Sequence, residues 1–290
     1  MCVICCEHLV NPSSHDPCCM QFFNAPQRFN CSALLMLILG SLALAPLPSV
    51  AAEEALHPWI SRPLKSPEPA NYITNLRDGD RIETPYLLKF GLSQYGLAGI
   101  SDEAPRTGHH HLLINQDLPL DFSKPLPFTE NYVHFGKGQM ETVLTLKPGT
   151  YTLRMLLANH KHIPLFIYSP KITITVTATH PEIKPASLIT PGVTILSPRD
   201  GETVSSPMLI RMHGSGLNIG HEKIKANDAG HFRLLFRSER GATETIELKR
   251  GQTESWLRPP SGSYKVQALF VQNASGKVTQ RTAEQDLTVR

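Results

Sequence analysis

The sequence predicts an all-β protein built from two tandem sandwich domains, and two observations carry this prediction. The chain contains an internal repeat: residues 73–176 open with ITNLRDGDRIETPYLLKFGL, and residues 193–289 open with the similar VTILSPRDGETVSSPMLIRMHG. Both copies also consist of short segments rich in β-branched and aromatic residues, which are separated by Gly, Pro and Asp turns. A repeat of roughly 100 residues is too long for a solenoid unit and suits a duplicated domain.

The expected strands follow the same order in both copies. In the first copy they are Tyr86–Leu92, His109–Asn115, Thr142–Leu146, Tyr151–Ala158 and Lys171–Val176. In the second copy they are Met208–Met212, His231–Arg237, Thr243–Leu248, Tyr264–Val271 and Gln285–Val289. No apolar period of 3.6 residues extends beyond two helical turns. Short strands separated by turns within about 100 residues are typical of an immunoglobulin-like or fibronectin-like β-sandwich.

Alternation along one strand of each copy predicts the inner face of each sandwich. The two inner rows are Tyr151, Leu153, Met155 and Leu157 in the first copy, and Tyr264, Val266, Ala268 and Phe270 in the second. The expected division of the chain is a leader over residues 1–52, a proline-rich arm over 53–71, the first sandwich over 72–176, a linker over 177–192 and the second sandwich over 193–290.

The first 52 residues contain the pattern of a signal peptide. An apolar run, Ser32–Ala45, follows Arg28 and precedes small residues, so cleavage is expected near Ala51 or Ala52. The run would span only about 21 Å as a helix, which is shorter than a bilayer core of about 30 Å. No other segment could cross a membrane. The mature chain is therefore expected to be periplasmic or secreted.

All six cysteines lie before residue 32, so the expected mature chain has no disulfide and no thiol chemistry. A zinc cluster formed by the cysteines of residues 2–19 with His8 and His15 is an alternative. We favour another interpretation, in which Met20 is the true initiator and residues 1–19 are a mis-assigned gene start. The net charge of +3 is small, and no basic run occurs, which argues against a nucleic-acid partner.

Six of the 13 histidines fall in the first copy, and most of them have no counterpart in the second. Residues i and i+2 of a strand share a face, roughly 6.5–7 Å apart, so the two imidazoles of an H-x-H pair can reach one metal ion. Aligning the two copies places His110 on Phe232, which belongs to an apolar alternating row. His110 is therefore expected to face the core, and His109 and His111 the opposite face.

Five histidines form the expected ligand set, and they are His109, His111, His134, His160 and His162. His134 aligns with Glu247 of the second copy, whereas His160 and His162 follow a strand and lie in a loop. Two other uses of these histidines stay open. They could form a hydrogen-bonded structural cluster, or they could serve an organic ligand or catalysis.

The ligand types favour copper, with zinc as the second choice. Imidazole suits both metals, and Cu²⁺ stands highest in the stability order of divalent ions. A thioether from Met140 or Met155 would favour Cu⁺, and Asp102 or Glu103 could add a carboxylate. Because neutral imidazole is the ligating form, affinity is expected to fall below a pH of about 6.5.

Four motifs of the first copy occur in a fixed order: GHHHLLI at 108–114, HFGKGQ at 134–139, LxPGxYxL at 146–153 and HxHxP at 160–164. These blocks resemble the DUF4399 family, a bacterial exported domain of uncharacterised function. The second copy looks like a diverged relative, which keeps Gly230-His231 and Gly251-Gln252. The resemblance implies a β-rich, exported and histidine-bearing domain, and it supplies no reaction.

The sequence thus predicts an exported, non-enzymatic module that binds a transition metal ion through a histidine cluster. The alternative is a structural or adhesion module that binds an envelope protein or glycan, with histidines that are purely structural. A zinc-dependent hydrolase would need an open coordination position and a carboxylate base. Asp102 and Glu103 precede the cluster without a specific spacing, and neither an HExxH motif nor a serine nucleophile elbow occurs.

Overall fold

The computed structural model describes residues 56–61, 68–100 and 103–290. The predicted leader, its cleavage site and part of the proline-rich arm (53–55 and 62–67) lie outside these residues, so the leader and its cleavage site stay predictions. Residues 53–290 belong to one compact unit. Among the described residues, no helix is long and apolar enough to cross a membrane.

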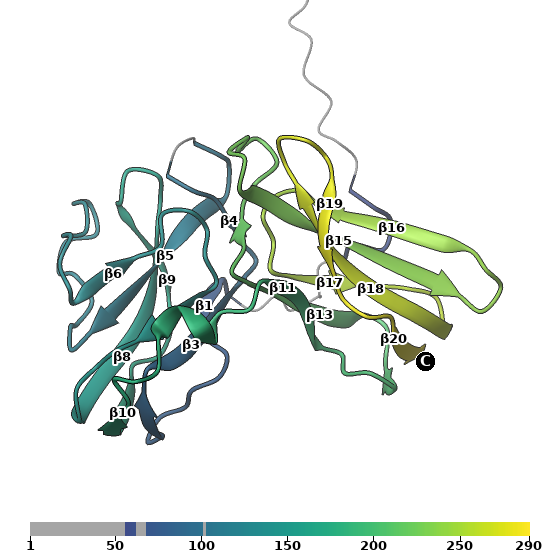
Figure 1. Ribbon diagram of the computed structural model, residues 1–290. Coiled ribbons are helices and arrows are strands. Elements are labelled where there is room, and N and C mark those ends of the chain that lie inside the picture. Colours follow the sequence, from purple (N-terminus) through teal and green to yellow (C-terminus); the bar gives the residue numbers. More distant parts are fainter. Residues whose placement is uncertain (1–55, 62–67, 101–102) are drawn as a thin grey trace, which may run out of the picture. The chain divides into compact units, whose positions relative to one another are not determined.

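Ten strands form the first copy (Figure 1). They are β1 (Ala70–Ile73), β2 (Arg81–Thr84), β3 (Tyr86–Ser93), β4 (Gly96–Leu97), β5 (Thr107–Ile114), β6 (Tyr132–His134), β7 (Glu141–Leu144), β8 (Gly149–Ala158), β9 (Pro164–Tyr168) and β10 (Ile172–Thr179). One sheet has the order β1-β3-β7. The larger sheet has the order β2-β10-β8-β5-β4, with β6 paired to β5 and β9 paired to β8.

The second copy repeats this topology strand for strand. Its strands are β11 (Gly192–Ser197), β12 (Glu202–Val204), β13 (Met208–Ser215), β14 (Asn218–Ile219), β15 (Ala229–Ser238), β16 (Thr243–Leu248), β17 (Glu254–Leu257), β18 (Gly262–Gln272), β19 (Val278–Arg281) and β20 (Gln285–Val289). The sheets have the orders β11-β13-β17 and β12-β20-β18-β15-β14, with β16 on β15 and β19 on β18. A single 3₁₀ turn, η1 (Pro185–Leu188), is the one helical element of the described chain. The predicted all-β sandwich class is confirmed.

The core of the first sandwich lies between its two sheets, as the alternation predicted. Leu153 and Met155 of β8 pack there with Leu112 and Ile114 of β5. The same row continues to His110, whose ring is fully buried and meets the Phe90 ring edge-on at 4.8 Å. His110 therefore occupies the core position that Phe232 holds in the second copy, as expected from the alignment.

The outer face of β5 and β8 meets a connection that is longer in the first copy than in the second. Residues 115–131 connect β5 to β6, whereas residues 239–242 connect β15 to β16 in the second copy. The longer connection supplies Leu118, Phe122 and Leu126, which pack on the outward side chains of β5 and β8. On the same face of β5, His109 and His111 are buried.

Candidate metal centre

The centre of the site is the outward face of β5. Because side chains alternate along a strand, His109 and His111 point to the same side. Their Nε2 atoms are 2.9 Å apart, and the two residues are 0 % and 1 % exposed. The Nδ1 atoms of both rings are buried and have no hydrogen-bond partner within the described chain.

His134 arrives from the neighbouring strand. In the antiparallel register of β5 and β6 it is the direct partner of His111, and the two ring centroids are 5.2 Å apart. Its ring lies over Gly136, where a Cβ atom would come within 2.6 Å of the ring Nε2. The absence of a side chain at residue 136 thus allows the observed position of the imidazole.

His162 completes a cluster of four rings from a loop. The Asn159 side chain accepts hydrogen bonds from the backbone N–H groups of Lys161 and Ile163, which shapes the turn after β8. His162 has a φ of +61°, and its Nε2 lies 3.1 Å from that of His134. Phe128 of the covering loop packs against the rings of His134 and His162, with centroids 5.5 and 4.7 Å away.

The imidazoles are held in the neutral form that a metal ion requires. Burial, together with the neighbouring imidazoles, lowers the pKa of His109 to about 2. Burial, together with His134 and His162, lowers the pKa of His111 to about 3. The pKa values of the less buried His134 and His162 are also lowered, again chiefly by burial. All four rings therefore present lone pairs at neutral pH.

The spacing of the nitrogens is close to that of a coordination sphere. Ligand atoms of His109, His111 and His134 all lie within 4.8 Å of one another. Nitrogens bonded to one ion at about 2.0–2.1 Å lie roughly 3–4 Å apart, so small movements would accommodate a metal ion. Donors that converge in this way fit a nitrogen-ligated transition metal. Partners for the Nδ1 atoms of His109 and His111, which orient the ligands in many metal sites, are missing here among the described residues.

The structure does not bring the fifth predicted ligand into this cluster. The Nε2 atom of His160 instead lies 3.8 Å from a carboxylate oxygen of Glu103. The thioethers considered from the sequence are also elsewhere: Met155 belongs to the core between the sheets, and Met140 to a second apolar cluster. Asp102 lies outside the described residues.

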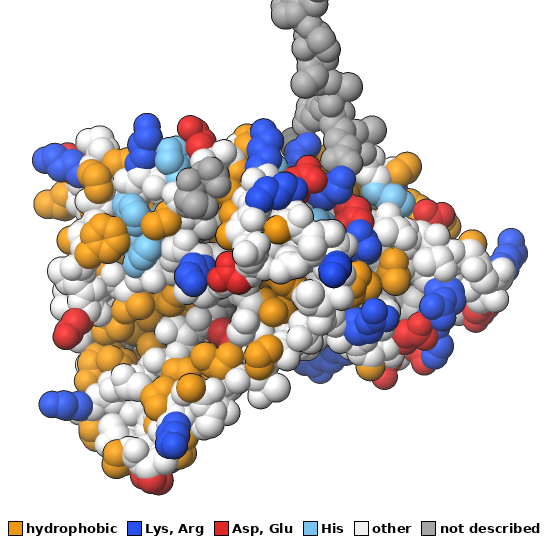
Figure 2. All heavy atoms as spheres, turned by 45° about the horizontal axis from the view of Figure 1, so that its top comes forward, with side chains coloured by type: hydrophobic (Ala, Val, Ile, Leu, Met, Phe, Trp, Pro, Cys, Tyr) orange, Lys and Arg blue, Asp and Glu red, His pale blue; other side chains and the backbone are white. Residues whose placement is uncertain are grey.

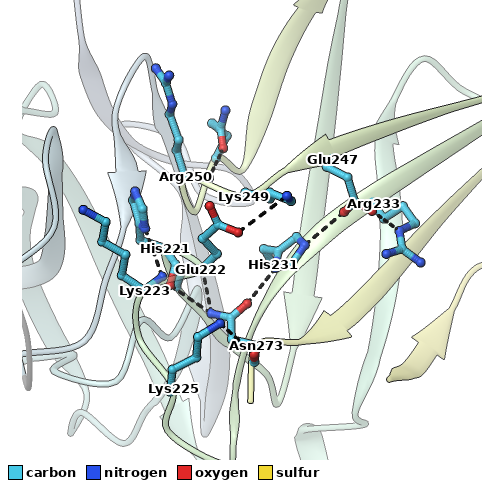
Figure 3. A network of polar contacts seen from close by, with 12 residues as sticks. His221, Glu222, Lys223, Lys225, His231, Arg233, Glu247, Lys249, Arg250 and Asn273 are labelled. Carbon is cyan, nitrogen blue, oxygen red and sulfur yellow. Dashed lines mark hydrogen bonds and ion pairs between the residues drawn. The ribbon is translucent and has the colours of Figure 1, made fainter. Parts of the chain in front are cut away.

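The second copy fills the same positions with a self-sufficient polar network (Figure 3). His231 stands at the position of His109, and its Nε2 and Nδ1 atoms contact Glu247 and Asn273 at 3.0 and 2.6 Å. Arg233, at the position of His111, donates from Nε to Glu247. Arg233 and Glu247 are direct strand partners, as His111 and His134 are in the first copy. Every polar group in this network therefore has a partner within the protein.

One segment of the first copy matches a known family. Residues 88–177 match DUF4399. This family is described as a domain of unknown function, and the matched segment contains all four clustered histidines. The resemblance expected from the sequence is thus confirmed for the first copy, and the family description assigns no activity.

Solved structures of fibronectin-type modules show a distant similarity to the chain. The chain is 12 % identical to fibronectin(III)-like modules of Clostridium thermocellum CbhA, with a TM-score of 0.21, covering 76 % of this chain and 92 % of that one. It is 12 % identical to the FN1–FN3 domains of chicken CNTN1, with a TM-score of 0.25 and coverages of 78 % and 68 %. These scores are too low to support any statement about function. No curated protein sequence matches the chain.

Two features that shape the site could not be predicted from the sequence. Phe128 covers two of the rings, yet nothing in the second copy corresponds to it because the connection there is shorter. The Arg233–Glu247 pair was visible only as two alignment positions. Its meaning, an ion pair in place of two imidazoles, follows from the shared strand register.

Proposed function

We propose that the first sandwich binds a transition metal ion through His109, His111, His134 and His162, with copper favoured over zinc. The observation that carries this proposal is the contrast between the two copies. In the second copy the equivalent side chains satisfy one another, whereas in the first copy four neutral imidazoles cluster and the buried Nδ1 atoms of His109 and His111 have no partner among the described residues. The Nε2 atoms lie 2.9 Å apart in His109 and His111 and 3.1 Å apart in His134 and His162, and a bound ion would use the lone pairs of these nitrogens.

A non-enzymatic role fits this arrangement better than hydrolysis. Four imidazoles can fill a tetrahedral coordination sphere, whereas a hydrolytic zinc site keeps one position open for water. A hydrolytic site would also need a carboxylate base. Glu103 contacts His160 and not the cluster. We therefore propose a module that holds or delivers the ion. Export to the periplasm or out of the cell, inferred from the apolar run before residue 52, is part of the same proposal.

The alternative is a structural or adhesion module in which the histidines only hydrogen-bond to one another. One observation favours it: His231 of the second copy serves such a structural role in its network. This alternative predicts no metal affinity, and its partner would be an envelope protein or glycan.

Metal titration distinguishes the two functions. Residues 53–290, which form one compact unit, would be purified without a histidine tag and stripped with chelator. We expect one equivalent of copper to bind, and zinc more weakly, as measured by competition with a chromogenic chelator. His134→Ala and His162→Ala should each weaken binding at least tenfold, because each removes one ligand. Both variants should still fold, since these two rings are partly exposed and lie outside the core.

His180→Ala is the matched control. His180 is an exposed histidine that contacts Glu83 and Glu182, and it lies outside the cluster. Its loss should leave the affinity unchanged. If the parent protein binds no metal, or if His180→Ala weakens binding as much as His134→Ala does, the metal function is wrong and the structural alternative is favoured.

A further inference from the structure

The four clustered histidines differ from most other histidines of the described chain in their charge environment. Five histidines elsewhere each lie within 3.8 Å of a carboxylate oxygen. They are His57, His160, His180, His213 and His231. No ion pair found among the described residues involves a ring of the cluster. Among the residues that the structure describes, the site is therefore built from neutral donors.

The lack of carboxylate partners affects ion binding strongly because the site is buried. His109 and His111 are buried, and Leu113 of the same strand face packs in an apolar cluster with Leu126 of the covering loop. The pKa values of the four rings are lowered by burial and, in three of them, by neighbouring imidazoles. An ion held here would thus keep its whole charge, because no carboxylate or thiolate of the described residues contacts the four rings.

The cost of placing a charge in such surroundings rises with the square of that charge, so a dication costs about four times as much as a monocation of equal radius. We propose, on the basis of the metal function proposed above, that the four-imidazole site selects monovalent copper, Cu⁺, over the divalent ions Cu²⁺ and Zn²⁺. Divalent ions would bind well only together with an anion such as hydroxide or chloride. Such an anion would enter on the partly exposed side, at His134 and His162.

Charge, rather than the softness of the ligands, is the basis of this selection. Thioether ligands are the usual reason for a preference for Cu⁺. Met140 and Met155 are both buried in apolar clusters away from the rings, so they do not contribute. The selection follows from what surrounds the nitrogens, and it can therefore be reversed by one added carboxylate.

The second copy indicates where that carboxylate belongs. Glu247 occupies the register position of His134, and its side chain reaches toward His231, the counterpart of His109. His134→Glu should accordingly place a negative charge among the remaining rings. His134→Gln removes the same imidazole without adding charge, so it is the matched control.

The test compares ions and variants under anaerobic conditions. Cu⁺ affinity is measured by competition with bicinchoninate, and Cu²⁺ and Zn²⁺ affinities by competition with nitrilotriacetate in chloride-free buffer. The parent protein should bind Cu⁺ at least tenfold more tightly than Cu²⁺, which corresponds to a rise of about 59 mV in the reduction potential of the bound couple. Added chloride should strengthen Zn²⁺ binding and leave Cu⁺ binding unchanged.

The two variants complete the test. His134→Glu should shift the Cu⁺ to Cu²⁺ affinity ratio toward Cu²⁺ by at least tenfold, and His134→Gln should lower both affinities without changing the ratio. A parent protein that binds Cu²⁺ or Zn²⁺ as tightly as Cu⁺, with no effect of chloride, overturns the selection while the metal function stands. A protein that binds none of the three ions overturns both proposals.

Discussion

His111 and His134 are direct cross-strand partners on β5 and β6, in the register position that the second copy gives to Arg233 and Glu247. The two sandwiches thus place either two neutral imidazoles or an ion pair on the same scaffold. Cross-strand partners in an antiparallel pair lie about 4.5–5.5 Å apart, close enough for either pair to interact directly. The second copy therefore serves as an internal comparison, because its polar side chains pair with one another and need no ligand.

Exchange of this pair should abolish metal binding without loss of the fold. The double variant His111→Arg/His134→Glu copies the arrangement of Arg233 and Glu247 into the first sandwich. We expect copper affinity to fall at least a hundredfold, because two of four ligands are gone, whereas circular dichroism keeps the β spectrum. The reciprocal change, Arg233→His/Glu247→His, leaves the second copy one imidazole short of the cluster and should create at most weak binding. Retention of parental affinity by the first variant would show that the metal sits elsewhere.

His110→Phe should stabilise the protein. His110 is fully buried, both of its ring nitrogens lack partners in the described chain, and the second copy has Phe232 at this place. Replacing an unsatisfied buried polar ring by an apolar one of similar shape should raise the free energy of unfolding by about 1–3 kcal/mol. Urea unfolding at pH 7.5 measures this change. A loss of stability would mean that the His110 ring has a partner in solution, such as bound water.

The metal-free protein should be sensitive to mild acid. Burial lowers the pKa values of His109, His110 and His111 to about 2, 3 and 3, whereas histidine in the unfolded chain has a pKa of 6.5. Below pH 6.5 the unfolded chain therefore takes up protons that the folded chain refuses. Each of these histidines reduces the free energy of unfolding by about 1.4 kcal/mol per pH unit as the pH falls from 6.5 toward the folded value.

Unfolding curves between pH 7 and 5 measure this slope. His110→Phe should reduce it by about 1.4 kcal/mol per pH unit, because one of the three groups is removed. Bound metal should also make the slope steeper, since protons and metal compete for the same nitrogens of the folded protein. A variant with the parental slope would show that His110 is protonated in the folded state.

Copper affinity should persist to a lower pH than unperturbed histidines would allow. The pKa values of His134 and His162 are lowered by burial, and that of His134 also by the proximity of His162. Proton competition therefore begins below pH 6.5 rather than at it, and it begins at these two rings, which are less buried than the pair on β5. Affinities measured from pH 7.5 to 5 should stay level at first and then fall. A decline that starts above pH 6.5 would contradict the lowered pKa values.

Strand alternation explains which parts of the site could be predicted. The orientation of His110 and His111 followed from the alternation of side chains along one strand. Phe232, which aligns with His110, identified the face that points to the core. The distinction between His160 and His162 could not follow from it, because both lie in the loop after β8. There the positive φ of His162 and the Asn159 hydrogen bonds decide which ring turns to the cluster. The expected domain boundaries and the leader remain predictions.

Gly136→Ala should weaken metal binding although residue 136 is no ligand. An added Cβ would lie 2.4 Å from Cε1 and 2.6 Å from Nε2 of the His134 ring, closer than van der Waals contact allows. The ring must then rotate or shift away from His111 and His162. Because coordination requires nitrogens within a few tenths of an ångström of their positions, we expect a loss of affinity of about tenfold or more. The control is Gly192→Ala, where the added Cβ has no neighbour within 4 Å, so that affinity and stability should both be retained. Equal affinities for both variants would show that His134 does not bind the ion through the position observed here, and the ligand set would shrink to His109, His111 and His162.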